Sequence, residues 1–459
     1  MLQSWCDNHR DLTNAPMFLS TAIIENLVTE FQARRWQSEP MSKAMHIAWH
    51  HPEAVKDLAL AVMRALPEGG TFLDAALSFL PEEDWPQIIE KAVAALEADD
   101  HNEAAEAVTS YASLQCLPAV HPHLERLFHI DTLFQSYSGV YAWRESGIQH
   151  FTTLRQHLEQ SVSPSDTASS HYRRSYGDKR LRAWQAMLET RCPEVLEFAF
   201  SSAGTLHLTP DEVRAYSHQV GYEVREGAAQ SLYSNTVFHL AFPEGFLPLR
   251  PDFQASHPTW HFQGTGPLLR FGGGCPGVKC SVCGETVHHL LTLAPIPEVI
   301  GVSGLPSLTL ATCLSCLGWE VSPLFYAHGA DGTPRPLESA VEPHAPQFPS
   351  PPLQETTVRL AKTPPRWRWQ DWGLSNGRES LHRIGGHPCW IQDAEYPACP
   401  HCRQTMHFLL QLDSELPLQS GEGGPIEDTM DVIEWGSGGI AYGFWCDSCR
   451  VSGFLWQCT

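Results

Sequence analysis

The 459-residue sequence has no uncharged apolar run of 18 residues, so it predicts no transmembrane helix. Its first residues, MLQSWCDNHRDLTN, lack the basic start and apolar stretch of a signal peptide. We therefore expect a cytoplasmic protein, in which thiols stay reduced. The His-Glu-x-x-His motif and the Gly-rich nucleotide loop followed by Lys-Ser/Thr are also missing. Catalysis of the kinds that these motifs serve is therefore not expected.

Positive charge is scarce, because 30 Lys and Arg residues stand against 52 Asp and Glu residues, a net charge of −22. Such a surface repels phosphate groups, so neither nucleic acid nor an anionic membrane is an expected partner. A basic protein is the expected partner, and the oligomeric state stays open. Acidic clusters at 81–85, 97–106 and 415–431 are candidate docking points. A solvated, solubilising surface explains them equally well.

The 14 cysteines are unevenly distributed along the chain. Cys6, Cys116 and Cys192 stand alone and are interpreted as small buried side chains. Eight later cysteines form four Cys-x-x-Cys pairs, and two such pairs supply the four thiolates of a tetrahedral zinc site. Because a four-thiolate zinc has no open position for water, we predict two structural Zn²⁺ sites rather than catalytic ones. The predicted ligands are Cys280, Cys283, Cys313 and Cys316 at one site, and Cys399, Cys402, Cys446 and Cys449 at the other.

Segments rich in Ala, Leu, Glu and Val dominate the first 200 residues. Their apolar residues recur at three- and four-residue steps, most clearly from Ile88 to Leu96, which predicts amphipathic helices. Short helices joined by tight turns resemble HEAT-like repeats, and a simple helical bundle is the alternative. The serine-rich stretch 161–170 is expected to be a loop. Helices are expected at 20–36, 52–66, 71–80, 84–97, 101–115, 147–160 and 177–200.

After residue 201 the content of Gly, Pro and aromatic residues rises, and apolar runs shorten to strand length. Strands are expected at 236–242, 288–293, 308–312, 407–412 and 440–445. Seven prolines lie between Pro343 and Pro365, which favours extended chain. The predicted domains are an α-helical repeat-like domain at 1–200, a first β-rich zinc module at 201–328, a Pro-rich linker at 329–355 and a second β-rich zinc module at 356–459.

The two predicted zinc modules share one order of residues. RFGGGCPGVKCSVCGETVHHLLTL begins at Arg270, and RIGGHPCWIQDAEYPACPHCRQTMHFLLQL begins at Arg383. Each has Arg, an apolar residue, Gly-Gly and Cys-x-x-Cys, and His288 or His407 follows five residues after the second Cys. A second Cys-x-x-Cys closes each unit, which indicates an internal duplication. His288, His289 and His407 lie on predicted strands and are interpreted as packed, although replacement of a Cys ligand by His stays open.

Two further groups of residues have a functional and a structural interpretation. His46 and His50 are four residues apart on a predicted helix, which suits metal binding, but the sequence offers no third ligand nearby. Arg and Trp alternate from Arg366 to Trp369, and Trp372 follows three residues later. In so acidic a chain they predict an aromatic strand edge with Arg stacking, or a surface for a protein partner.

The second copy carries the strings IGGHPCWIQ, CPHC, MHFLLQLD and GGIAYGFWCDSC, which resemble two families. One is the bacterial YwqG-like family, with a Gly-Gly-x-Pro-x-Trp opening and a Phe-Leu-x-Gln-Leu strand. The other is the programmed cell death protein two family, which adds paired zinc-binding cysteines. The resemblance covers 356–459 and, more weakly, 201–328. The second family implies a chaperone that escorts a ribosomal protein, whereas YwqG-like modules resemble those in bacterial toxin–immunity systems. Neither family implies catalysis.

Together these observations predict an α+β multidomain protein, in which an α-helical region precedes two β-rich zinc-binding modules. The expected function is non-enzymatic binding of a basic protein, first of all as a toxin-neutralising immunity protein of a bacterium. One alternative is a chaperone for a basic client such as a ribosomal protein. Another is an enzyme with a pocket between the two modules.

Overall fold

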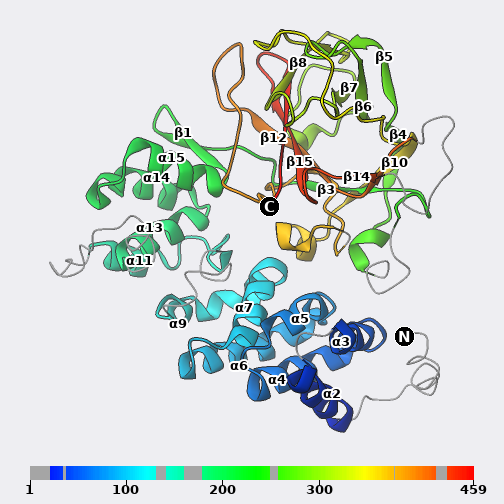
Figure 1. The fold of residues 1–459 in the computed structure, drawn as a ribbon. Helices are drawn as coiled ribbons and strands as arrows, with labels where there is room; N and C mark the ends of the chain where they lie inside the picture. Colours follow the sequence, from blue (N-terminus) through cyan, green and yellow to red (C-terminus); the bar gives the residue numbers. More distant parts are fainter. Residues whose placement is uncertain are drawn as a thin grey trace. The chain divides into compact units, whose positions relative to one another are not determined.

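The computed structural model describes residues 21–34, 38–130, 141–159, 178–248, 257–376, 378–419 and 432–459. The chain forms two compact units, with the boundary between His207 and Leu208. The first is helical and the second is built on an antiparallel sheet, so the predicted α+β class is confirmed (Figure 1). No helix in the described ranges has an apolar stretch long enough to cross a membrane. The predicted serine-rich loop at 161–170 lies outside the described residues.

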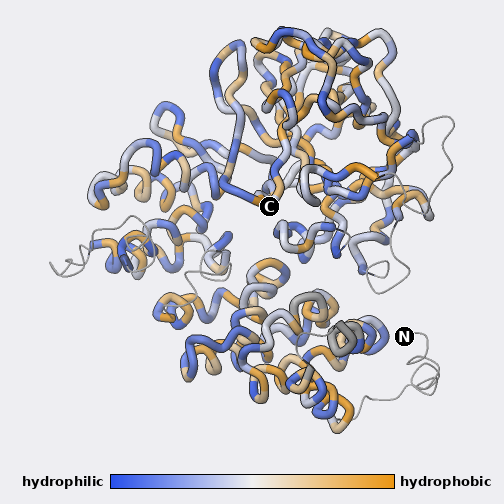
Figure 2. Tube along the Cα trace, in the orientation of Figure 1, coloured by the Kyte–Doolittle hydropathy of each residue, from blue (hydrophilic) through white to orange (hydrophobic). Residues whose placement is uncertain are grey.

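The first unit buries the apolar stripe of each helix against its neighbours. In α6 the side chains of Trp85, Ile88, Ile89 and Val93 are fully buried, as the helical spacing predicts. Helix α4 packs against α6, and α5 packs against α7. Apolar and polar residues are interspersed along the helices (Figure 2). The HEAT-like arrangement stays a prediction. The helices are α2 (Thr21–Arg34), α3 (Ser38–His50), α4 (Val55–Ala65), α5 (Gly70–Leu77), α6 (Trp85–Ala98), α7 (Glu103–Gln115), α8 (Leu117–Val120), α9 (Leu124–Phe128), α11 (Phe151–Glu159), α13 (Lys179–Glu189) and α14 (Pro193–Ser202).

The helix predicted at 177–200 is two helices, α13 and α14. Pro193 has no amide hydrogen for an intrahelical bond, and Arg191 adopts a left-handed backbone with φ of 55°. Helix α15 (Pro210–Gln219) in the second unit was not predicted. Its sequence signal is a capping box, in which the Thr209 side chain accepts from the Glu212 amide and the Glu212 carboxylate accepts from the Thr209 amide.

One twelve-stranded sheet forms the centre of the second unit, in the order β5-β6-β4-β10-β3-β11-β12-β15-β16-β8-β9, with β7 on β6. Every pairing in it is antiparallel. Two small sheets, β1-β2 and β13-β14, lie outside it. The strands are β1 (Tyr222–Arg225), β2 (Ala228–Ser231), β3 (Val237–Ala241), β4 (Thr265–Phe271), β5 (Gly274–Lys279), β6 (Thr286–Leu293), β7 (Leu308–Thr312), β8 (Leu324–His328), β9 (Pro334–Pro336), β10 (Thr356–Lys362), β11 (Arg383–Gly385), β12 (His407–Asp413), β13 (Leu416–Pro417), β14 (Val432–Ile433), β15 (Ile440–Cys446) and β16 (Val451–Gln457).

The two copies of the duplicated unit exchange strands at the middle of this sheet. Strand β3 precedes the first copy in sequence, but it pairs with β11 of the second, where His239 lies opposite Arg383. Strand β10 precedes the second copy, but it pairs with β4 of the first, where Thr357 lies opposite Arg270. Strands β3 and β10 also pair with each other. Each copy therefore needs a strand from the other to satisfy its backbone hydrogen bonds.

This exchange changes the predicted division into two zinc modules and a linker. Strands from 201–328 and from 356–459 alternate in one sheet, since β8 pairs with β16 as well. The stretch 329–355 contains β9, which pairs with β8, and it is hydrogen-bonded to the first copy near its end. It is part of the second unit and does not tether two separate modules. Sequence periodicity gives the strands but not their partners, which is why the exchange was not predicted.

Candidate metal centres

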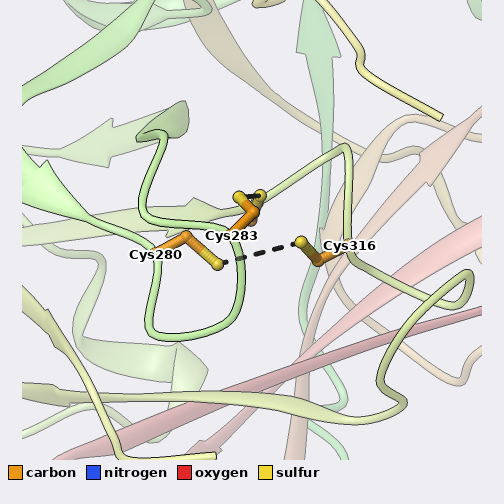
Figure 3. A group of neighbouring side chains, drawn as sticks. Cys280, Cys283 and Cys316 are labelled. Carbon is orange, nitrogen blue, oxygen red and sulfur yellow. Dashed lines mark hydrogen bonds between the residues drawn. The ribbon is translucent and has the colours of Figure 1, made fainter. Parts of the chain in front are cut away.

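The first candidate centre joins two tight loops. Cys280 and Cys283 lie in the loop between β5 and β6, and Cys313 and Cys316 follow β7. The sulfur atoms of Cys280 and Cys316 are 4.0 Å apart (Figure 3). Those of Cys283 and Cys313 are 3.7 Å apart. All four sulfur atoms lie within 4.8 Å of one another. Three of the four residues are buried and Cys283 is half-buried.

The second candidate centre repeats this geometry. Cys399 and Cys402 precede β12, and Cys446 and Cys449 lie at the turn between β15 and β16. The sulfur atoms of Cys402 and Cys446 are 3.6 Å apart, and all four lie within 4.8 Å of one another. Both predicted sets of four ligands are therefore brought together.

The first loop of each centre has the same backbone bonds. The Cys280 amide donates to the Glu285 carbonyl at 2.8 Å, and the Cys399 amide donates to the Gln404 carbonyl at 2.8 Å. The residue after the second Cys has a left-handed backbone in both, with φ of 73° at Gly284 and 63° at Arg403. The internal duplication thus extends from the sequence to the local backbone.

The sulfur separations fit a tetrahedral metal ion. Metal–sulfur bonds of about 2.3 Å in a regular tetrahedron place the sulfur atoms about 3.8 Å apart. The closest measured separations, 3.6 to 4.0 Å, bracket this value. They are far longer than the roughly 2.05 Å of a disulfide bond. The donor set is compatible with two metal sites, each made of four sulfur atoms and no histidine.

The thiols at the first centre influence one another's protonation. Hydrogen bonds from Cys313 and Cys316 hold the pKa of Cys280 well below its usual range. Their bonds to Cys280 raise the pKa of Cys313 and of Cys316. These shifts favour a thiolate at Cys280 beside neutral thiols at Cys313 and Cys316. A bound cation would displace the remaining protons, because only thiolates are strong metal ligands.

At the second centre the Cys402 pKa falls to about 7. Burial raises this pKa, but hydrogen bonds from the Gln404 amide and from the thiol groups of Cys446 and Cys449 together lower it by more than burial raises it. Burial raises the pKa of Cys399 to about 12. Cys280 at the first centre and Cys402 at the second are therefore the cysteines whose pKa is lowered.

Comparison with known proteins gives one informative match. No protein-family model and no solved structure matches the chain. A Salmonella typhimurium protein, described as uncharacterized protein YpfL, is 27% identical over an alignment of 277 residues that covers 56% of this chain. The chain spans about half the length of that relative, 52%. The resemblance to the YwqG-like and programmed cell death protein two families stays a prediction.

The histidines that the sequence singled out lie outside the sulfur clusters. His288 accepts from the Leu314 amide through Nδ1 and bonds to the Ser350 carbonyl through Nε2. His289 bonds to the Gly272 carbonyl. His46 and His50 have ring centroids 4.2 Å apart, and no third ligand joins them in the described part of the chain.

The Arg- and Trp-rich stretch begins and ends in short 3₁₀ helices, Pro365–Trp367 and Trp372–Leu374, and is not the predicted strand edge. The rings of Trp367 and Trp369 are buried. The guanidinium groups of Arg366 and Arg368 lie over them, 4.7 and 5.2 Å from the ring centroids. The predicted Arg stacking is present. The alternative of a partner surface would need exposed rings.

One serine in this region has the Gly-x-Ser-x-Gly spacing of a hydrolase nucleophile, in the string GLSNG from Gly373. A nucleophile elbow requires the serine on a sharp strand-to-helix turn with an exposed hydroxyl. Ser375 instead follows a short 3₁₀ helix, is buried, and accepts from the Asn376 side chain at 3.1 Å. The spacing alone therefore does not make it a catalytic candidate.

A buried polar network beside β11 was not predicted. Arg383 is buried and donates to the Gln370 side-chain oxygen at 3.3 Å and to the Cys389 sulfur at 2.9 Å. The Gln370 amide nitrogen donates to Glu379 at 2.9 Å. Burial raises the pKa of Glu379 to about 7. The shared Arg-apolar-Gly-Gly motif contains Arg383, but the burial of this Arg depends on residues scattered through 239–389.

Proposed function

We propose that the chain is a non-enzymatic protein, held in shape by two structural zinc ions, that binds a basic protein. Four thiolates in a closed tetrahedral set are the usual ligands of structural Zn²⁺. Each ion would add folding free energy on the order of 10 kcal/mol at neutral pH. Each copy has its four cysteines in loops at the ends of strands, so loss of either ion would affect the strands that end at those loops.

An acidic hollow on the helical unit is the observation that supports a basic partner. This cavity of about 650 Å³ is lined by Glu97, Asp99, Asp100 and Glu125, and by one guanidinium group, that of Arg126. Arg126 donates to Glu97 at 2.7 and 2.9 Å. Three of the carboxylates belong to the predicted acidic cluster 97–106. A concave site with four carboxylates and one guanidinium favours a cationic surface and would speed its encounter.

A bacterial toxin is the partner class that we favour, which would make the chain an immunity protein. The YwqG-like resemblance supports this choice, and the similar Salmonella protein provides a bacterial setting. A chaperone for a basic client is the alternative, which the programmed cell death protein two resemblance supports. Both have the same requirement, a basic protein surface that meets the acidic hollow.

Charge reversal at the hollow tests the proposal. After affinity capture and mass spectrometry have identified a partner, the double variant Asp99→Lys/Asp100→Lys should associate about tenfold more slowly at low salt. For the unchanged protein, association should slow as salt rises, since the Debye length falls from roughly 10 Å at 0.1 M to about 3 Å at 1 M. Stopped-flow measurement of the association rate decides this.

The matched control is Glu82→Lys/Glu83→Lys, which makes the same charge change in the acidic cluster 81–85, outside the hollow. It should retain most of the association rate. Equal slowing in both variants would mean that only the net charge matters. Association that is indifferent to salt and to both changes would reject electrostatic docking on this unit. Of the third predicted acidic cluster, 415–431, residues 420–431 lie outside the described residues.

A further inference from the structure

The first candidate centre, formed by the loops Cys280–Cys283 and Cys313–Cys316 next to His288, holds a segment of the chain itself through that segment's main-chain groups. The segment is the end of the predicted Pro-rich linker. The amide of His344 donates to the Val282 carbonyl at 2.9 Å. The amide of Ser350 donates to Ser315 Oγ at 2.9 Å, and its carbonyl accepts from His288 Nε2 at 3.1 Å. The side chains of Ser315 and His288 thus bind both main-chain polar groups of one residue, Ser350.

The second candidate centre repeats these two residues, and no segment among the described residues is bonded to them in the same way. His407 is the equivalent of His288, five residues after the second Cys, and Ser448 is the equivalent of Ser315, third in Cys-x-x-Cys. Ser315 is 3% exposed beneath its segment, whereas Ser448 is exposed and His407 is half-buried. Within the described ranges, Ser448 Oγ bonds only to sulfur atoms, and His407 bonds through Nδ1 to the Phe408 carbonyl.

A cavity of about 390 Å³ lies beside the Cys446–Cys449 turn of the second centre, and His407 and Ser448 both line it. The β1-β2 hairpin contributes Arg225 and Gln230 to the lining of the cavity, and Gln404 lines it as well. Gln230 and Gln404 are exposed, and a side-chain amide donates and accepts as a peptide main chain does. Gln404 already accepts from Arg225 at 3.4 Å and keeps its amide N–H groups for a ligand. The volume falls in the range of roughly 300–1,000 Å³ that ligand sites occupy.

We propose that this cavity binds an extended peptide segment of the partner protein through its main chain. An amide N–H of the segment donates to Ser448 Oγ, as the Ser350 amide donates to Ser315 Oγ in the first copy. His407 Nε2 and the amides of Gln230 and Gln404 bond to the neighbouring peptide units. The site deepens the protein-binding function proposed above and rests on it for the source of the segment.

A library of random 12-residue peptides displayed on phage provides the probe, panned against the zinc-loaded full chain. We expect enriched peptides whose affinity, measured by fluorescence polarisation, falls about tenfold or more in Ser448→Ala/His407→Ala. Two neutral hydrogen bonds account for a loss of that size. Ser437→Ala, an exposed serine outside the cavity, is the matched control and should bind as tightly as the unchanged protein.

A scan of N-methylated peptides tests the main-chain contact itself. Methylation of one amide should weaken binding about tenfold in the unchanged protein and should have no further effect in Ser448→Ala. Zinc content and the unfolding midpoint are measured for each variant. If Ser448→Ala/His407→Ala loses zinc, Gln230→Ala/Gln404→Ala takes its place in the comparison.

Three results would overturn the site: no enriched peptide, enriched peptides that ignore the cavity variants, or binding that no N-methyl group weakens. The last would indicate a side-chain or small-molecule site. The peptide assay needs no identified partner and does not involve the acidic hollow. Its failure therefore leaves the Asp99→Lys/Asp100→Lys result standing, and failure at the hollow leaves the peptide result standing.

Discussion

The contrast between Cys275 and the eight clustered cysteines shows what a single side chain contributes at these centres. Cys275 is buried, and burial raises its pKa to about 11, so it stays a neutral thiol. The sulfur clusters exclude it. Cys402 sits in a cluster where neighbouring donors lower its pKa to about 7. Proximity of other ligands, rather than the thiol itself, makes a cysteine a metal ligand.

Cys402→Ser should reduce the metal content from two ions per chain to about one. A three-thiolate site loses much of its metal-binding and folding free energy, so the unfolding midpoint of the second unit should fall as well. Elemental analysis of the purified protein measures the first effect, and a denaturant titration the second.

Cys275→Ser is the control for this prediction and should keep both ions. A lower metal content in Cys275→Ser would show that Cys275 is a ligand at the first centre. Fewer than one ion per chain in the unchanged protein would contradict both candidate centres.

Glu379 gives a pH-dependent prediction. Its pKa is about 7 in the fold and near 4.5 when exposed, because burial disfavours the carboxylate. Between these values the folded protein holds a proton that the unfolded chain releases, so this group's contribution to stability falls as pH rises. Glu379→Gln cannot ionise and should gain up to about 3 kcal/mol relative to the unchanged protein between pH 5 and 7.5. Urea unfolding at several pH values measures this difference.

The buried histidines around Glu379 act in the opposite direction, so the difference between the two proteins is what counts. Burial lowers the pKa of His239, His257 and His382 to about 3, which costs stability as pH falls below about 6.5. These residues are common to both proteins and their effect cancels. The exposed control Glu338→Gln should show no pH-dependent gain. A flat difference for Glu379→Gln would mean that Glu379 is ionised in the fold.

At the scale of elements, the Gly-Gly of each copy lies at the end of a strand, where another backbone segment passes close to its first glycine. A Cβ on Gly272 would lie 2.2 Å from the Gln354 carbonyl oxygen, and one on Gly385 would lie 2.3 Å from the Thr236 carbonyl oxygen. Both glycines have left-handed φ values, 73° and 68°. The repeated Gly-Gly therefore marks the place where each copy receives the strand that comes from the other.

Gly385→Ala should destabilise the second unit more than Gly277→Ala. Gly277 also has a left-handed φ, 81°, but a Cβ there meets nothing within 4 Å. The control should cost about 1–2 kcal/mol for backbone conformation alone. Gly385→Ala should cost about 2 kcal/mol more, because backbone must shift to relieve the clash. Urea midpoints compare the two, and equal losses would show that the close approach is absent in solution.

At the scale of the whole molecule, the exchanged strands make the duplicated copies inseparable. The second copy receives β3 on one edge of its strands and β8 beyond β16. The first copy receives β10 from beyond the Pro-rich stretch. Separating the copies would leave unpaired strand edges, which expose backbone groups and invite aggregation.

Expression of fragments tests this consequence. Residues 208–459 should fold, hold two metal ions and give a well-dispersed amide spectrum. Residues 356–459 lack β3 and β8 and should be unfolded or aggregated, even though they contain one complete set of four cysteines. A monomeric, folded 356–459 fragment with one bound ion would show that the strand exchange is dispensable.

The sequence by itself determined the helical and β-rich parts, the position of the main strands, the duplication and both sets of four cysteines. These features depend on local periodicity and on short spacings, which the order of residues expresses directly. Tertiary structure decided that β3 pairs with the second copy and β10 with the first, and that Glu379 and Arg383 share a buried network. It also decided that a chain segment covers Ser315, whereas Ser448 is exposed and lines a cavity. Such features depend on contacts between residues more than a hundred positions apart. Two sequences with the same local pattern can form different long-range contacts, because strand pairing and burial are set by the fold as a whole.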